Sequence, residues 1–116
     1  MKIINYADAP LIASEKVGII GASHLSVRPL VTQGDGASAF SMVILELAPG
    51  GSTPAHSHQR EEEIFVKVGQ GIVKYSGEQT SVGPGSVLFI GSNEDHQFVN
   101  TGDEIMEILC ATQIEN

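Results

Sequence analysis

The sequence predicts an all-β protein with a single domain, either a β-sandwich or a β-barrel. Short runs of Val, Ile, Leu and Phe recur along the chain, and clusters of Gly, Pro, Asn and Ser separate them. Such clusters favour turns, because Gly reaches positive φ angles and Pro fixes φ. Strands that alternate with turns about every 8–12 residues are typical of sandwiches and barrels. The length of 116 residues suits one hydrophobic core and not two.

Each expected strand is an apolar run that ends at a turn cluster. The runs predict strands over residues 40–47, 64–68, 72–75, 87–90, 97–100 and 105–111. The clusters between them lie at residues 34–36, 49–51, 69–71, 76–78, 83–85, 91–93 and 100–102. No stretch after residue 36 keeps a helical apolar period without a Gly or Pro inside it. The one helical turn that the pattern suggests is short and lies near residues 8–13.

Charge and composition exclude several classes of function. The chain has 14 acidic and 6 basic residues, and its net charge of -8 repels nucleic-acid phosphates and anionic lipid surfaces. No apolar run approaches the roughly 20 residues that a membrane helix needs. The single cysteine, Cys110, cannot form an intramolecular disulfide, which favours a reducing compartment. We therefore expect a cytoplasmic protein with no nucleic-acid partner and no membrane association.

Two histidines separated by one residue, His56 and His58, follow the turn at residues 49–51. On an extended strand such residues point to the same face, with Cα atoms about 6–7 Å apart. Imidazoles at that separation can reach one metal ion with bonds of about 2.0–2.2 Å. The pair alone is more typical of a solvated strand end, so the assignment depends on further ligands.

Glu62 is the acidic residue whose position fits the same ion. If a strand begins at Glu62, the apolar Ile64 shares its face, whereas Glu63 lies on the opposite, largely polar face. Four residues of straight strand would carry Glu62 about 13 Å beyond His58, too far to share a metal. Residues 59–61 must therefore form a turn that brings the carboxylate back under the histidines.

A third imidazole, His96, follows the polar turn at residues 92–95. Three imidazoles and one carboxylate form a donor set that suits Fe, Mn, Ni or Zn. The sequence therefore predicts one divalent transition metal per chain, bound by His56, His58, Glu62 and His96. The fourth histidine, His24, has no such neighbours and is expected at the surface or as a satisfied core residue.

Inward-facing side chains on neighbouring strands are expected to line a substrate pocket beside the metal. The residues assigned to it by strand parity are Met42, Ile64, Val66 and Phe98, and Leu25 or Arg28 could join them from the N-terminal strands. This lining favours a small, apolar or partly aromatic molecule. No cluster of Lys and Arg is present to hold a nucleotide diphosphate.

The sequence identifies no catalytic residue besides the metal ligands. Glu63, Tyr75 and His24 remain as candidates for a general base, and each is better explained as a surface or structural residue. Cys110 lies within an apolar run and is expected to be a packed, unreactive small hydrophobe.

These segments resemble the two sequence motifs of the cupin superfamily, in particular its small single-domain, conserved-barrel (cupin 2, RmlC-like) proteins. The first motif is matched at every interval, by Gly50, His56, His58, Glu62 and Gly69. The second is matched by Gly85, His96 and Asn100, whereas Gly91 and Asn93 stand where the motif has Pro and Gly. Neither replacement removes a ligand. Gln59 and Arg60 replace the Pro-Trp pair of some relatives and make the rim of the site more polar.

The resemblance implies a double-stranded β-helix, the jelly-roll cupin barrel, over residues 17–116, with a metal in the mouth of the barrel. It also implies that residues 1–16 form an N-terminal segment packed on, or exchanged with, the partner subunit of a homodimer. The expected function is that of a mononuclear metalloenzyme, dioxygenase-like, acting on a small organic substrate. A metal-dependent isomerase or decarboxylase, and a cupin that binds or senses a small molecule without converting it, are the alternatives.

Overall fold

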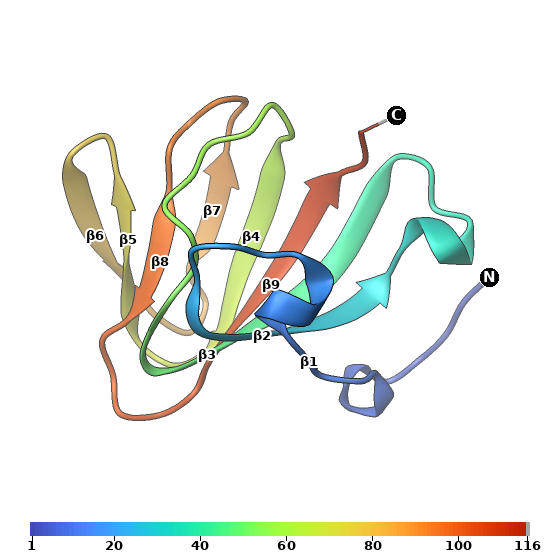
Figure 1. Cartoon of the computed structure of the whole chain (residues 1–116), viewed down its shortest axis with the longest axis horizontal. Helices are drawn as coiled ribbons and strands as arrows, with labels where there is room; N and C mark the ends of the chain where they lie inside the picture. Colours follow the sequence, from blue (N-terminus) through green and yellow to red (C-terminus); the bar gives the residue numbers. More distant parts are fainter. Residues whose placement is uncertain (116) are drawn as a thin grey trace.

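The computed structural model describes residues 1–115 and has an almost entirely β architecture (Figure 1). The nine strands are β1 (Ile12–Ala13), β2 (Ser23–Val31), β3 (Phe40–Ser52), β4 (Glu62–Val68), β5 (Gly71–Tyr75), β6 (Glu78–Val82), β7 (Val87–Ile90), β8 (Gln97–Asn100) and β9 (Met106–Gln113). Within the described residues the helices are three 3-10 turns, η1 (Tyr6–Asp8), η2 (Ser14–Val17) and η3 (Gln33–Asp35). None of these helices is long and apolar enough to cross a membrane.

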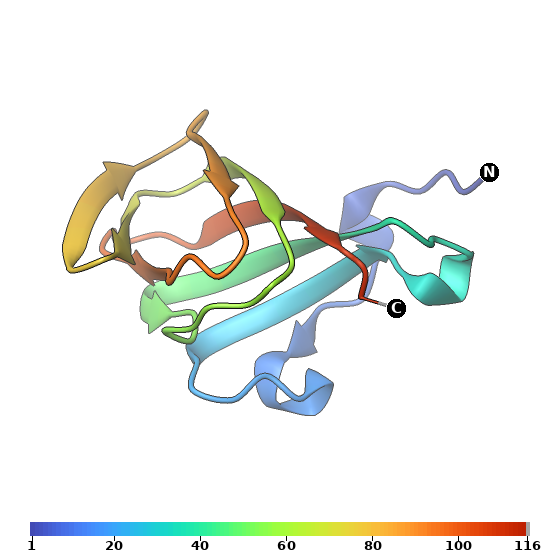
Figure 2. The same ribbon diagram turned by 90° about the horizontal axis from the view of Figure 1, so that it is seen from above.

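The strands form one strongly curled sheet with the order β6-β5-β8-β3-β9-β4-β7, and β2 joins β3 outside this path. All pairings are antiparallel. Figure 2 shows the long strands β2, β3 and β9 running side by side, with the shorter strands curled over one end. Residues of β5, β6 and β7 line a common groove, so the two ends of the sheet approach each other. The prediction of an all-β, jelly-roll single domain is confirmed.

Alternating burial on β4 defines the inside of the barrel. Ile64 and Val66 are buried, whereas Glu63, Phe65 and Lys67 are exposed. Inward-facing residues of β2, β3 and the strands from β5 to β9 complete the core, and burial of this apolar surface is the main stabilising contribution. The core cluster comprises Leu25, Val27, Leu47, Ile64, Val66, Val73, Val82, Ile90, Phe98, Met106, Ile108 and Cys110.

The N-terminal segment lies against the outer face of the sheet in its own chain. The Lys67 ammonium donates a hydrogen bond to the Tyr6 hydroxyl and lies 4.7 Å from the centre of the Tyr6 ring. At the other end, Lys2 donates to the carbonyl of Leu30 and pairs with Asp35. Packing or exchange of this segment across a homodimer stays a prediction, and the mass of the protein in solution tests the dimer that it requires.

Two local elements differ from the sequence predictions. Strand β6 was not expected, because four of its five residues are exposed and it contains no apolar run. The helical turn expected near residues 8–13 is wrong in position: η1 ends at Asp8, and Ile12–Ala13 form β1 through pairing with β2. Asn5 is the N-cap of η1, because its side chain accepts a hydrogen bond from the backbone N–H of Ala7.

Candidate metal centre

Backbone pairing brings His56 and His96 together from distant parts of the chain. The two residues form an isolated antiparallel bridge, with His56 N donating to His96 O at 3.2 Å and His96 N donating to His56 O at 2.9 Å. The neighbouring loop is held in the same way, because Asn93 N donates to His58 O at 2.7 Å. The loop after β3 and the loop before β8 therefore form one platform that carries three imidazoles.

A bend at Gln59 and Arg60 returns the chain toward this platform, and β4 begins at Glu62. Glu62 is the register partner of Thr112 on β9, and the Thr112 hydroxyl donates to Glu62 Oε2 at 3.2 Å. The turn that the distance argument requires at residues 59–61 is therefore present. It places the carboxylate on the inner face of β4, in phase with Ile64.

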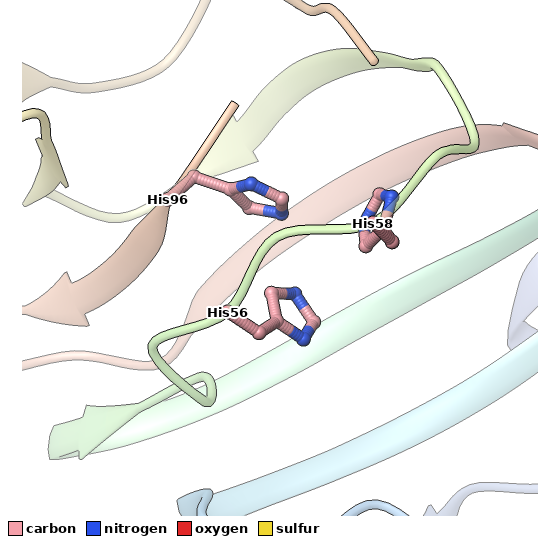
Figure 3. A group of neighbouring side chains, drawn as sticks. All are labelled: His56, His58 and His96. Carbon is pink, nitrogen blue, oxygen red and sulfur yellow. The ribbon is translucent and has the colours of Figure 1, made fainter. Parts of the chain in front are cut away.

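The three imidazoles converge on one point inside the mouth of the barrel (Figure 3). Their ring centres are 4.7–5.1 Å apart, and one nitrogen of each ring lies within 4.8 Å of one nitrogen of both others. They are thus positioned to bind one metal ion. Glu62 Oε1 lies 2.7 Å from His58 Nε2 and 3.5 Å from His96 Nε2. Ligand atoms about 2.0–2.2 Å from a shared metal are separated by about 3 Å, so these spacings fit a common ion.

Backbone carbonyls set the orientation of two of the rings. Nδ1 of His58 lies 2.8 Å from the carbonyl oxygen of Arg60, and Nδ1 of His96 lies 2.9 Å from that of Glu94. A carbonyl oxygen only accepts, so each Nδ1 carries the proton. Nε2 is then the atom of each ring that faces Glu62 and the shared point: in the charged ring it donates to the carboxylate, and in the neutral ring its lone pair is free to bind a metal. This arrangement of a ligand and its supporting acceptor is typical of metal-binding histidines.

The carboxylate also organises the electrostatics of the site. Burial favours the protonated form of Glu62, but the hydrogen bond from His96 and the charges of His58 and His96 outweigh it and lower the pKa of the carboxyl. The same carboxylate, with the carbonyl of Glu94, raises the pKa of His96 against the effect of burial. Burial and the two neighbouring imidazoles lower the pKa of His56. A negative charge therefore lies beside three nitrogen donors, which suits a divalent cation.

A cavity of about 520 Å³ opens from this centre, and Leu25, Ile64 and Phe98 line part of it. Val66 is fully buried deeper in the core and does not line it. The assignment of Met42 is corrected: this residue is 37% exposed. The side chains of β3 that face inward are those of Ser41, Val43 and Leu45, and they line the cavity in place of Met42. Both faces of β3 carry apolar side chains, so its sequence does not define the phase.

Residues that the sequence analysis did not assign complete the cavity. Val17, Ile19 and Ile20, from the end of η2 and the loop after it, cover one side. Thr112 and Arg60 add polar groups to the wall. Thr112 could have been found from the register of β4 and β9, but no signal in the sequence indicates that residues 17–20 fold over the barrel mouth.

The other residues that the sequence analysis considered for a chemical role lie outside the metal centre or are unreactive. Glu63 and His24 are exposed, and Arg28 points away from the cavity to Glu46, 3.0 Å away. The Tyr75 hydroxyl is hydrogen-bonded to Thr80 within the β5–β6 hairpin. Cys110 is buried, and burial together with the charge of Glu62 raises the pKa of its thiol well above the usual value. The prediction of a packed, unreactive cysteine agrees with this environment.

Comparison with curated proteins finds partial relatives. The chain is 35% identical over 67 residues to the oxalate-binding protein of Thermotoga maritima, covering 57% of this chain and 55% of that protein. It is 31% identical over 115 residues to auxin-binding protein 1 of Arabidopsis thaliana, covering 90% of this chain and 55% of that protein. The chain thus spans about half the length of the curated relatives it matches.

Comparison with solved structures and family models extends the likeness to the whole barrel. The polyketide cyclase RemF from Streptomyces resistomycificus has a TM-score of 0.89 and 32% identity, covering 99% of this chain and 80% of that chain. The family model for the cupin domain, Cupin_2, matches residues 43–112, which include all three clustered histidines and Glu62. The protein belongs to the cupin domain family.

Proposed function

We propose that the protein is a metal-dependent cupin enzyme that acts on a small, largely apolar organic molecule. In this proposal His56, His58, Glu62 and His96 hold one divalent transition metal, of which Zn, Fe, Mn and Ni are the candidates. The observation that carries it is the convergence of three imidazoles and a carboxylate at the polar end of a mainly apolar cavity of about 520 Å³.

The chain's own residues would prepare this centre for chemistry. The carbonyls of Arg60 and Glu94 fix two rings, and Thr112 fixes Glu62. The apolar wall excludes water from the ligand, which strengthens electrostatic interactions inside the cavity. When bound, the metal would supply Lewis-acid polarisation of a carbonyl group.

The likeness to a polyketide cyclase favours carbonyl activation over the dioxygenase-like reaction that the sequence also allowed. In ring closure of a polyketide, the carbon of an enolised CH₂ group attacks the carbonyl carbon of another unit, and the two CH₂ hydrogens leave with the carbonyl oxygen as water. Polarisation of that carbonyl group favours the attack. A Lewis-acid metal at the end of this cavity would supply that polarisation without oxygen. We therefore place ring closure or isomerisation of a polycarbonyl compound first among the reactions.

A second candidate is a cupin that binds its ligand without converting it. Among the described residues lining the cavity, the ionisable groups other than the four proposed ligands are Arg60 and Cys110. Neither can serve as a general base, because an arginine stays protonated and the pKa of Cys110 is raised well above its usual value. The oxalate-binding and auxin-binding relatives favour this alternative.

One experiment separates these functions. The protein is loaded with Zn, Mn or Ni, or anaerobically with Fe(II), and incubated with aromatic 1,3,5-triketones, 1,3-diketones, thiols and catechols while oxygen uptake and products are measured. Metal-dependent loss of water from a polycarbonyl substrate without oxygen uptake is expected. Oxygen consumption would replace this proposal with the dioxygenase reaction. Binding of the diketones with no product from any metal form would support the binding protein.

Replacing Glu62 with alanine should weaken metal binding, whereas the same change at Glu63 should have little effect. Glu62 Oε1 lies beside two imidazoles, and Glu63 is exposed on the opposite face of β4. Metal content after dialysis against a weak chelator measures the difference. Since the two variants remove the same charge one residue apart, equal losses would show that general electrostatics, and not ligation by Glu62, holds the metal.

Replacing Thr112 with valine should weaken metal affinity about 10–100-fold, the range found when a group that orients a ligand is removed. Valine keeps the shape of the side chain but loses the hydrogen bond to Glu62 Oε2. Competition with a chromophoric chelator measures the affinity. The matched control is Thr80→Val, which removes a hydroxyl that bonds to Tyr75. Unchanged affinity in the Thr112 variant would show that the carboxylate does not depend on this bond.

A further inference from the structure

The guanidinium group of Arg60 lies at the cavity wall without a hydrogen-bond partner among the described residues. Its Nε atom is buried and unsatisfied, although the side chain as a whole is 41% exposed. The nearest recorded carboxylate oxygen, on Glu115, is 3.9 Å from Nε, beyond hydrogen-bond distance. Arg28 Nε is also buried without a partner, but the two terminal nitrogens of Arg28 donate to Glu46 and to the carbonyl of Ala9, whereas Arg60 makes no side-chain hydrogen bond to the described residues. Arg60 is thus a buried donor whose acceptor is not supplied by this part of the chain.

The charge of the cavity differs in sign from the charge of the protein. Among the described residues that line it, Arg60 is the single Lys or Arg and Glu62 is the single carboxylate. With a divalent cation on the proposed ligands, these charges sum to +2, whereas the formal charge of the whole chain is -8. Arg60 is close enough to the histidines to lower the pKa of His56. The interior therefore attracts an anion that most of the surface repels.

The rest of the cavity wall favours an anion whose uncharged part is apolar. Apolar side chains form much of the wall, among them Ile19 from the loop after η2, Val27 from β2 and Leu45 from β3. A volume of about 520 Å³ is within the range of sites for drug-sized ligands, which bury most of their surface against such walls. An inorganic anion or a short dicarboxylic acid would leave this apolar surface without a partner.

We propose that Arg60 is a specificity residue that binds the carboxylate of an apolar or aromatic organic acid, whose opposite end presents oxygen donors to the metal centre. Guanidinium and carboxylate groups match in shape and form paired, charge-assisted hydrogen bonds. Such a bond would satisfy the buried Nε. The inference rests on the proposed function, because the second attachment point is the metal.

The test uses probes that differ in the carboxylate alone. Benzohydroxamate binds divalent metals through its two oxygens, and its meta and para carboxy derivatives add an anion at the far end of the ring. The corresponding carbamoyl derivatives have the same shape without the charge. Dissociation constants for zinc-loaded protein, measured by titration calorimetry, give the preference for carboxy over carbamoyl. We expect at least one isomer to show a preference of about tenfold or more.

The Arg60→Gln variant should bind both derivatives equally while keeping its affinity for benzohydroxamate. Lys16→Gln is the matched control, since it removes the same charge from η2 without touching the cavity, and it should keep the preference. No preference in the wild type for either isomer, or an undiminished preference in Arg60→Gln, would overturn the role of Arg60 alone. Failure of the wild type to bind benzohydroxamate at all would overturn the proposed metal function with it.

Discussion

Replacing His96 with alanine is expected to abolish stoichiometric metal binding while the barrel stays folded. His96 Nε2 faces Glu62, and its ring centre lies 4.7 Å from that of His56 and 5.0 Å from that of His58. Removal of a residue that only supports a ligand lowers metal affinity by about 10–100-fold. Removal of one of the four ligands themselves should therefore lower it by at least about 100-fold. The bridge to His56 uses backbone atoms, so the platform does not require the imidazole.

Elemental analysis after dialysis, together with circular dichroism, measures this result. His24→Ala is the matched control, because His24 is exposed and lies outside the cavity. The control should keep about one metal ion per chain, the value expected for a single four-ligand site. A His96→Ala variant that retained the wild-type metal content would remove this residue from the ligand set.

Replacing Phe98 with alanine should produce the largest loss of stability. Phe98 is 2% exposed, belongs to the core cluster and also lines the cavity. Truncation of a buried phenylalanine costs about 3–5 kcal/mol, because apolar contacts are lost and the space left behind fills only partly. The hydrogen bond from Phe98 N to the Thr53 hydroxyl involves the backbone and should survive. The free energy of unfolding in urea measures the cost.

Phe65→Ala provides the comparison on the outer face of β4. This phenylalanine is 43% exposed and projects away from the core, so its truncation should cost about 1 kcal/mol or less. Similar losses for the two variants would contradict the division between the inner and outer faces of the barrel. Because Phe98 borders the cavity, its variant should also bind benzohydroxamate differently from the Phe65 variant.

The sequence contained enough information for the general architecture and for the geometry around Glu62. The turn clusters and apolar runs predict six of the strands, and the alternation after Glu62 gives the phase of β4 because its outward positions are largely polar. The distance from His58 to Glu62 requires the bend that the structure contains at Gln59 and Arg60. These features depend on local spacing, which a sequence records directly.

Other features depend on contacts between segments that are distant in the sequence, and the spacing of residues along the chain does not predict such contacts. Met42 was assigned to the wrong face because β3 is apolar on both faces. Ile44, on the same face as Met42, is also buried, although it lies outside the core cluster. Strand β6 exists because it pairs with β5, not because its own residues favour burial. The buried, unpaired Nε of Arg60 and the position of residues 17–20 at the cavity wall depend on the assembled barrel mouth.

Anomalous diffraction from crystals of the zinc-loaded protein would test the central claim most directly. We predict one strong peak per chain, about 2.0–2.2 Å from a nitrogen of each of His56, His58 and His96 and from an oxygen of Glu62. A peak at another site, or a zinc ion bound without these side chains, would contradict the account.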